Sequence, residues 1–142
     1  MYKSILVPTD GSALSAIAIN EAATLAKEIG SRVVLFYSPL TAGLSPPIRP
    51  RERELAQKAL AAEAEHVLSS AARNVNLAGL AVEQHFTVSH SPSEAIVEAA
   101  KAFHCDLIIM ASHGRHGLSA VLHGSETQAV IRDSKVPVIV VH

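Results

Sequence analysis

The chain has 142 residues, a formal net charge of −1 and 49% hydrophobic residues, few of them aromatic. This length favours a single domain over residues 1–142 whose core needs neither metal nor disulfide bonds. Nucleic-acid binding usually requires clustered Lys and Arg, and the nearest such cluster, at 49–53, is interrupted by Pro50 and Glu52. We therefore expect no nucleic-acid partner.

The sequence also indicates the cellular compartment. A single cysteine, Cys105, excludes an intramolecular disulfide bond, so nothing indicates an oxidising environment. No segment approaches the roughly 20 apolar residues that span a membrane. The first apolar run stops at Pro8, which is too early for a signal peptide. We expect a cytoplasmic protein without membrane insertion.

Apolar runs, which predict buried strands, alternate along the chain with segments of helical periodicity. We expect strands at 4–7, 32–37, 80–88, 106–110 and 136–141. We expect helices at 13–29, 51–73, 92–103 and 125–133. Asp10 or Ser12 caps the first helix and Gly30 ends it. The prolines of 39–50 predict a long loop, either a functional lid or a disordered insertion.

Two further helices start with the spacing of a capping box, in which a Ser side chain and a Glu or Gln three residues later satisfy backbone amides. Ser91 and Glu94 form one such pair, with Pro92 at the first helical position. Ser125 and Gln128 form the other, which predicts that the last helix begins there.

This alternation predicts an open, five-stranded parallel α/β sheet with helices on both faces and right-handed crossovers. The C-terminal strand at 136–141 is short and strongly β-prone, and it is expected at a sheet edge. Pairing with the same strand of a second subunit would bury that edge and give a homodimer. Burial under the subunit's own helices is the alternative, although it would leave the edge free.

The stretch from Asp106 to Gln128 combines a buried strand, a glycine-bearing loop and a helix start. Unpaired amides at a helix N-terminus bind anions, so this arrangement indicates a phosphate site. Open parallel sheets bind ligands where the strand order reverses. If the first strand is central, the loops Pro8–Ser12 and Ala111–Ser125 meet at that point.

The spacing within this stretch is more specific than a pair of glycines. Gly114 is followed by nine residues and then by Gly124-Ser125, the second half of a motif that reads Gly, two residues, Gly, nine residues, Gly, Ser or Thr. The chain also begins with the apolar run at 5–7 and Pro8-Thr9-Asp10-Gly11-Ser12. Together these features resemble the universal stress protein family in its ATP-binding, single-domain form, and the resemblance covers the whole chain.

The resemblance implies strand order 3-2-1-4-5, a Rossmann-like, adenine-nucleotide α-hydrolase-like architecture, and ATP with Mg²⁺ at the switch point. Pro8 and Asp10 would flank the adenosine, Ser38 would offer backbone atoms to adenine, and Gly124 and Ser125 would hold phosphates. The full predicted nucleotide site is Pro8, Thr9, Asp10, Ser38, Met110, Ala111, His113, Gly114, Arg115, Gly117, Gly124, Ser125 and Glu126.

Three of these residues depart from the family pattern. Ala111 replaces the first glycine of the motif and adds a methyl group, which an extended backbone tolerates but a positive φ does not. Ser38 stands where a small apolar residue is usual. Glu126 would repel phosphate unless it turns away or meets a metal ion. Weak binding, or a preference for ADP or AMP, stays open.

The loop also holds three histidines and one arginine. A zinc site at His113, His116 and His123 is disfavoured, because glycines interrupt any helix there and no other ligand lies nearby in sequence. We expect no metal site and interpret these histidines as loop residues. Arg115 either reaches phosphate oxygens or lies on the solvated surface.

Efficient catalysis is not indicated. No nucleophile-elbow motif or Ser-His-Asp arrangement is recognisable, and Asp10 is the one acid placed convincingly at the site. The first hypothesis is a dimeric, nucleotide-binding regulatory module of the stress response that acts on an unidentified protein partner. The alternatives are a slow ATP hydrolase and a purely structural interaction dimer.

Overall fold

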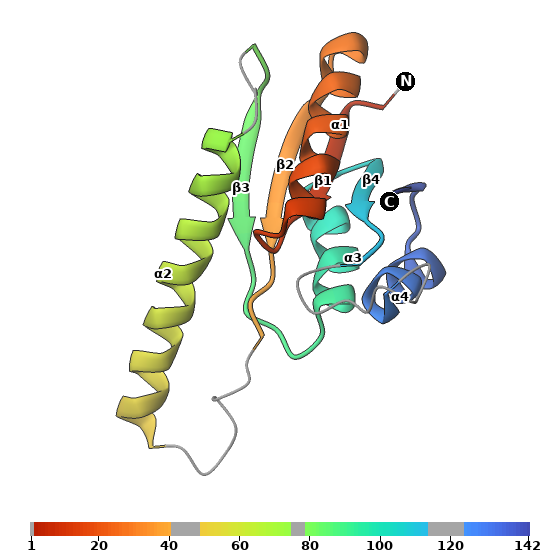
Figure 1. Ribbon diagram of the computed structural model, residues 1–142. Helices are drawn as coiled ribbons and strands as arrows, with labels where there is room; N and C mark the ends of the chain where they lie inside the picture. Colours follow the sequence, from red (N-terminus) through yellow and green to blue (C-terminus); the bar gives the residue numbers. More distant parts are fainter. Residues whose placement is uncertain (1, 41–48, 75–78, 114–123) are drawn as a thin grey trace.

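A computed structural model describes residues 2–40, 49–74, 79–113 and 124–142 (Figure 1). The elements are β1 (Ser4–Pro8), α1 (Ala13–Ile29), β2 (Arg32–Tyr37), α2 (Pro50–Asn74), β3 (Val82–Phe86), α3 (Pro92–Ala102), β4 (Leu107–Ala111), α4 (Ser125–Asp133) and β5 (Val138–Val141). All strand pairs are parallel and follow the order β3-β2-β1-β4-β5. The predicted fold class and strand order are confirmed.

Helices cover both faces of the sheet, α1 and α2 on one side and α3 and α4 on the other (Figure 1). Successive residues of β1 alternate between these layers: Ile5 and Val7 pack against α1 and α2, whereas Leu6 packs against α3 and α4. A strand covered on both faces has no solvent-facing positions, so its sequence is a continuous apolar run. This is why the central strands were recognisable from sequence.

The ends of α1 are fixed by its flanking residues. The Ser12 side chain accepts a hydrogen bond from the Ser15 amide at 3.2 Å and is the N-cap, whereas Asp10 instead accepts from the Ser12 amide. Gly30 ends the helix with φ +76°, a left-handed conformation that glycine adopts without strain. Both features match the predicted start and stop of this helix.

The two predicted capping boxes differ in outcome. Ser91 caps α3 by accepting from the Glu94 amide, with Pro92 at the start of the helix as predicted. For α4 the predicted helix start at Ser125 is confirmed, but the predicted capping box is wrong, because the N-cap is Gly124 and Ser125 is already the first helical residue. The Gly124 amide donates to the Ser112 carbonyl at 2.6 Å, which places the N-cap at Gly124, one residue before Ser125.

The edge strands are shorter than their sequence patterns predicted. β3 occupies Val82–Phe86 within the predicted 80–88, and β5 occupies Val138–Val141 within the predicted 136–141. Pro137 has no amide hydrogen to donate to a neighbouring strand, although its carbonyl accepts from the Ile108 amide at 3.0 Å. β5 lies at the sheet edge as expected, pairing with β4.

Two sequence predictions concern segments around α2. Residues 41–48 of the predicted loop 39–50 lie outside the described residues, and the helix begins at Pro50. Figure 1 shows the N-terminal half of α2 extending beyond the C-terminal ends of the strands.

No helix among the described ranges is long and apolar enough to cross a membrane.

Candidate functional site

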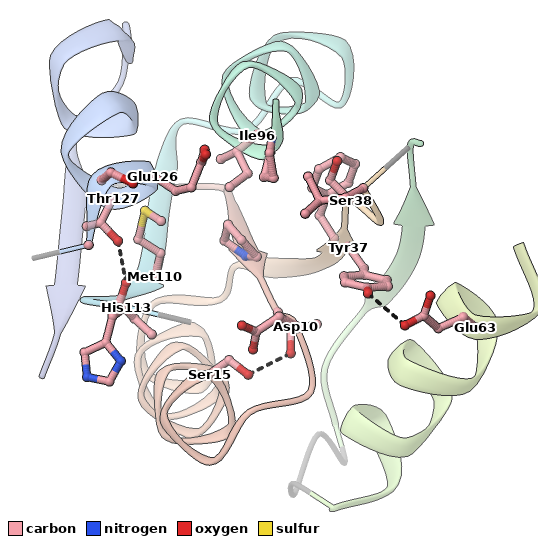
Figure 2. Close-up of a pocket in the computed structure, with 18 of the residues that line it drawn as sticks. Asp10, Ser15, Tyr37, Ser38, Glu63, Ile96, Met110, His113, Glu126 and Thr127 are labelled. Carbon is pink, nitrogen blue, oxygen red and sulfur yellow. Dashed lines mark hydrogen bonds between the residues drawn. The ribbon is translucent and has the colours of Figure 1, made fainter. Parts of the chain in front are cut away.

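A cavity of about 500 Å³ opens at the C-terminal ends of β1, β2 and β4, with walls from α2, α3 and α4 (Figure 2). Ligand pockets usually measure about 300–1,000 Å³. The cavity lies beside β1, where the strand order reverses. The predicted site residues in its lining are Pro8, Thr9, Asp10, Ser38, Met110, Ala111, His113, Gly124, Ser125 and Glu126. The other predicted residues, Gly114, Arg115 and Gly117, lie outside the described residues.

The loop from β1 to α1 contributes one wall of the cavity and is held by its own polar groups. The Thr9 amide donates to the Phe36 carbonyl at 2.8 Å, which extends the β1–β2 pairing into the loop. The Thr9 hydroxyl lies 3.0 Å from the Ser15 hydroxyl, and both side chains are buried. Asp10 Oδ1 accepts from the Ser12 amide at 2.9 Å, so the carboxylate has a fixed position beside the cavity.

The opposite wall is the junction of β4 and α4. Buried Thr127 donates its hydroxyl hydrogen to the Ala111 carbonyl at 3.0 Å, which ties the first turn of α4 to the end of β4 (Figure 2). Gly124 gives α4 no side-chain cap. Among the described residues, no side chain caps the first-turn amides of α4, and such amides bind anions.

Ala111, which replaces a glycine of the family motif, is accommodated without backbone strain. It is the last residue of β4, it pairs with Val141, and it is buried. His104 is the residue with positive φ among the described non-glycine positions, so the backbone at Ala111 needs no glycine. The added methyl group is tolerated by the conformation of the chain.

Glu126 turns from α4 toward α3 (Figure 2). Its Oε2 accepts a hydrogen bond from the Ser93 amide at 2.7 Å. Ser93 lies in the first turn of α3, where backbone amides have no partner within the helix. The carboxylate thus serves the start of α3 while remaining part of the cavity lining.

The β2 end of the cavity has polar groups that the sequence did not reveal. The Tyr37 hydroxyl donates to Glu63 of α2 at 3.3 Å (Figure 2). Ser38 lies beside them, and its buried hydroxyl has no hydrogen-bond partner among the described residues. Leaving a buried hydroxyl unpaired costs about 1–3 kcal/mol. Within the described part of the chain, this end of the cavity therefore holds a buried hydroxyl without a hydrogen-bond partner.

Sequence reasoning missed part of the lining: Ser15, Phe36, Tyr37, Leu40, Leu60, Glu63, Pro92, Ile96 and Thr127. The positions of Phe36 and Tyr37 at the carboxyl end of a buried strand were an available signal. Leu60 and Glu63 lie in the middle of α2, and no local pattern marks them. Their place at the cavity follows from the packing of that helix beside β2 and β3.

The charges of the lining are mostly negative. Asp10, Glu63 and Glu126 contribute carboxylates, and the described part of the lining includes no Lys or Arg. No group of three metal-ligating side chains is found among the described residues. His113 lines the cavity, whereas the other two histidines of the disfavoured zinc hypothesis, at 116 and 123, lie outside the described ranges.

Cys105, the lone thiol, is not in the cavity lining. Burial raises the pKa of this thiol, although a hydrogen bond with Ser4 lowers it in part. A thiol reacts through its thiolate form, which a raised pKa makes scarce at neutral pH. We interpret Cys105 as a packing residue.

Comparison with known proteins identifies the family. The model of the universal stress protein family matches residues 1–142. Universal stress protein MJ0577 of Methanocaldococcus jannaschii is 33% identical over 156 residues, covering 99% of this chain and 95% of that protein. Universal stress protein MJ0531 of the same organism is also 33% identical, covering 99% of this chain and 82% of that protein.

Solved structures show the same likeness. The structure of MJ0577 has a TM-score of 0.85 with 33% identity and covers 99% of this chain and 96% of that one. A universal stress protein crystallised in complex with cAMP has a TM-score of 0.73 with 27% identity and covers 99% and 97% of the two chains. The family model and the 33% identical relatives span essentially the whole sequence. This chain belongs to the universal stress protein family.

Proposed function

We propose that this protein binds an adenine nucleotide, ATP with Mg²⁺, in the cavity at the ends of β1, β2 and β4. The observation that carries the proposal is the uncapped first turn of α4 beside a cavity of about 500 Å³ at the switch point of the sheet. The similar protein crystallised with cAMP supports an adenine-containing ligand. We further propose a regulatory role in the stress response, in the cytoplasm.

The lining suggests how the nucleotide lies. The base occupies the β2 end, between apolar Pro8 and Ile96, where the backbone of Ser38 offers a donor and an acceptor. The phosphates lie at the β4 end, against the amides of Ser125 and its neighbours in α4. Mg²⁺ accompanies the triphosphate because the carboxylates of the described lining add negative charge to an anionic ligand.

We propose that the active form is a homodimer paired through the C-terminal strand, 136–141. β5 is an edge strand, and Ile139 on it is 43% exposed. α4 links the two functions, because it starts at the proposed phosphate site and is followed directly by the turn into β5. Nucleotide binding would then affect the position of β5 at the dimer interface and the surface that a protein partner contacts.

Isothermal titration calorimetry with ATP and Mg²⁺ tests the proposal, using the Gly124→Val variant. A Cβ at this position lies 3.4 Å from both His113 Cβ and the Ser112 carbonyl oxygen, so the added valine methyl groups must occupy space at the start of α4. We expect at least a tenfold loss of affinity, or about 1.4 kcal/mol.

The matched control is Ala62→Val on the exposed side of α2, which should bind ATP as the unmodified protein does. Thermal unfolding shows that both variants are folded at the titration temperature. Normal ATP binding by Gly124→Val would contradict the phosphate position, and no binding of any adenine nucleotide by the unmodified protein would contradict the function.

A further inference from the structure

The carboxylate of Glu126 is a fixed negative charge at the phosphate end of the cavity. Glu126 is the second residue of α4 and follows Gly124 and Ser125, which line the cavity with it. Figure 2 shows its side chain between α4 and α3, on the same side of the cavity as Thr127 and Met110. Any anion at the first turn of α4 therefore lies close to this carboxylate.

A hydrogen bond between helices keeps the carboxylate in place. Oε2 accepts from the Ser93 amide at 2.7 Å, a distance typical of strong, charge-assisted hydrogen bonds. Moving Glu126 away into solvent would break this bond and leave an α3 amide without its acceptor. Glu126 is exposed, and this bond holds its carboxylate at the edge of the cavity.

Among the described residues of the lining, no lysine or arginine neutralises this charge. The described lining holds two other carboxylates, Asp10 and Glu63, and no Lys or Arg. Each phosphate added to a nucleoside brings further negative charge to the same end of the cavity. Like charges a few ångströms apart repel by about 1 kcal/mol in water and more near a protein surface.

We propose that Glu126 is a specificity-determining residue that makes the cavity select nucleotides by their net phosphate charge. It disfavours metal-free ATP relative to AMP and adenosine, and it makes triphosphate binding depend on Mg²⁺, which neutralises part of that charge. This inference rests on the proposed nucleotide function. Glu126 acts by repulsion from its position on Ser93 and is not a ligand of the metal ion.

The variant Glu126→Gln isolates the charge. Glutamine keeps an oxygen that accepts from the Ser93 amide and has nearly the same shape, so the α3–α4 contact is retained. Glu94→Gln is the matched control, because Glu94 is an acid in the first turn of α3 that does not line the cavity.

Calorimetric titrations with adenosine, AMP and ATP in EDTA, and with ATP and Mg²⁺, test the proposal. In EDTA, Glu126→Gln should strengthen ATP binding about tenfold and adenosine binding less than about twofold. The gain in ATP affinity on adding Mg²⁺ should be smaller in Glu126→Gln than in the unmodified protein by the same factor. Salt should strengthen metal-free ATP binding to the unmodified protein by screening this repulsion, and it should do so less in the variant.

Three results would overturn the proposal. An unchanged ratio of ATP to adenosine affinity in Glu126→Gln would show that the charge of Glu126 does not affect the binding of the phosphates. Weaker binding of ATP with Mg²⁺ in this variant would make Glu126 a metal ligand. An equal change of this affinity ratio in Glu94→Gln would show that the effect comes from the overall charge of the protein and not from the position of Glu126. In each case the unmodified protein still binds nucleotide, whereas failure of the proposed function appears as no binding of any of the three ligands.

Discussion

Thr127 holds the proposed phosphate site together through one side-chain hydrogen bond. The residue is buried, and its hydroxyl donates to the Ala111 carbonyl at 3.0 Å. Thr127→Val keeps the shape of the side chain but leaves that buried carbonyl without this donor. We expect the free energy of unfolding to fall by about 1–2 kcal/mol in urea titrations.

Thr24→Val supplies the control for this prediction. Thr24 also donates to a carbonyl, that of Asn20 at 3.0 Å, but on an exposed face of α1 where water can replace the hydroxyl. This variant should change the free energy of unfolding by less than about 0.5 kcal/mol. Equal decreases in the free energy of unfolding of the two variants would show that burial does not make the Thr127 hydrogen bond more stabilising than the exposed one.

Asp106 connects the start of β1 to the start of β4. Its carboxylate accepts from the Lys3 amide at 3.0 Å and from the Ser4 amide at 3.1 Å, and its own amide donates to the Ser4 carbonyl. Burial by itself raises the pKa of Asp106, but these backbone hydrogen bonds outweigh it and hold the pKa below the ordinary 3.8. The ionised form is therefore the one that stabilises the fold.

The sign of this shift predicts a pH dependence. A lowered pKa gives stability that is present above the unfolded-state value of 3.8 and is lost as the pH falls through the folded-state value. Asp106→Asn should reduce the free energy of unfolding by about 1 kcal/mol at pH 7. In urea titrations this difference should shrink as the pH falls below 3.8 and through the lowered pKa of the folded state.

Asp133→Asn is the control, because the pKa of Asp133 is also lowered, first by a hydrogen bond from Arg132, but at the protein surface. Exposed ion pairs contribute little to stability, so this variant should track the unmodified protein at every pH. If the free energy of unfolding of Asp106→Asn differed from that of the unmodified protein by the same amount from pH 7 to pH 2, the ionised carboxylate of Asp106 would not be the source of the stability.

The elements of this fold could largely be predicted from sequence, because each buried strand is an apolar run and two of the helices, α1 and α3, start at a serine cap. The exceptions follow from missing local signals. Gly124 has no side chain that marks it as an N-cap, so the sequence pattern predicted the N-cap at Ser125 instead. The ends of β3 are set by where its pairing with β2 stops, and the apolar residues Leu80 and Val88 extend beyond that point.

The candidate site was predictable where it follows strand ends and not where it depends on packing. Pro8, Asp10 and Ala111 come directly after or at the end of apolar runs, so the topology places them together. The bonds from Tyr37 to Glu63 and from Ser93 to Glu126 join residues 26 and 33 positions apart. No periodicity in the sequence indicates such pairs, because they arise when whole helices settle on the sheet.

At the scale of the whole molecule, the proposed dimer makes a sharp prediction. Val138 and Val141 pack against the subunit's own core, so a charge there would damage the monomer as well. Ile139 is 43% exposed, and Ile139→Lys places a charge on the proposed interface strand with little loss of internal packing. We expect this variant to sediment as a monomer.

Ile17→Lys is a matched control, since Ile17 is 47% exposed and belongs to α1, not to the proposed interface strand. It should sediment as the unmodified protein does. A dimer that survives Ile139→Lys would exclude β5 as the interface, and a monomeric unmodified protein would exclude the proposed dimer altogether.

The central place of β1 has a consequence for how the chain folds. One edge of β1 pairs with β2, about thirty residues later, while the other edge waits for β4, where Leu107 pairs with Ile5. Until residues 107–111 have been synthesised, this central apolar strand has one edge without a partner. Pairing over such long sequence separations slows folding. During synthesis this open edge is the natural site of aggregation and of chaperone binding, so substitutions that delay the docking of β4 should lower the yield of folded protein more than they lower its stability.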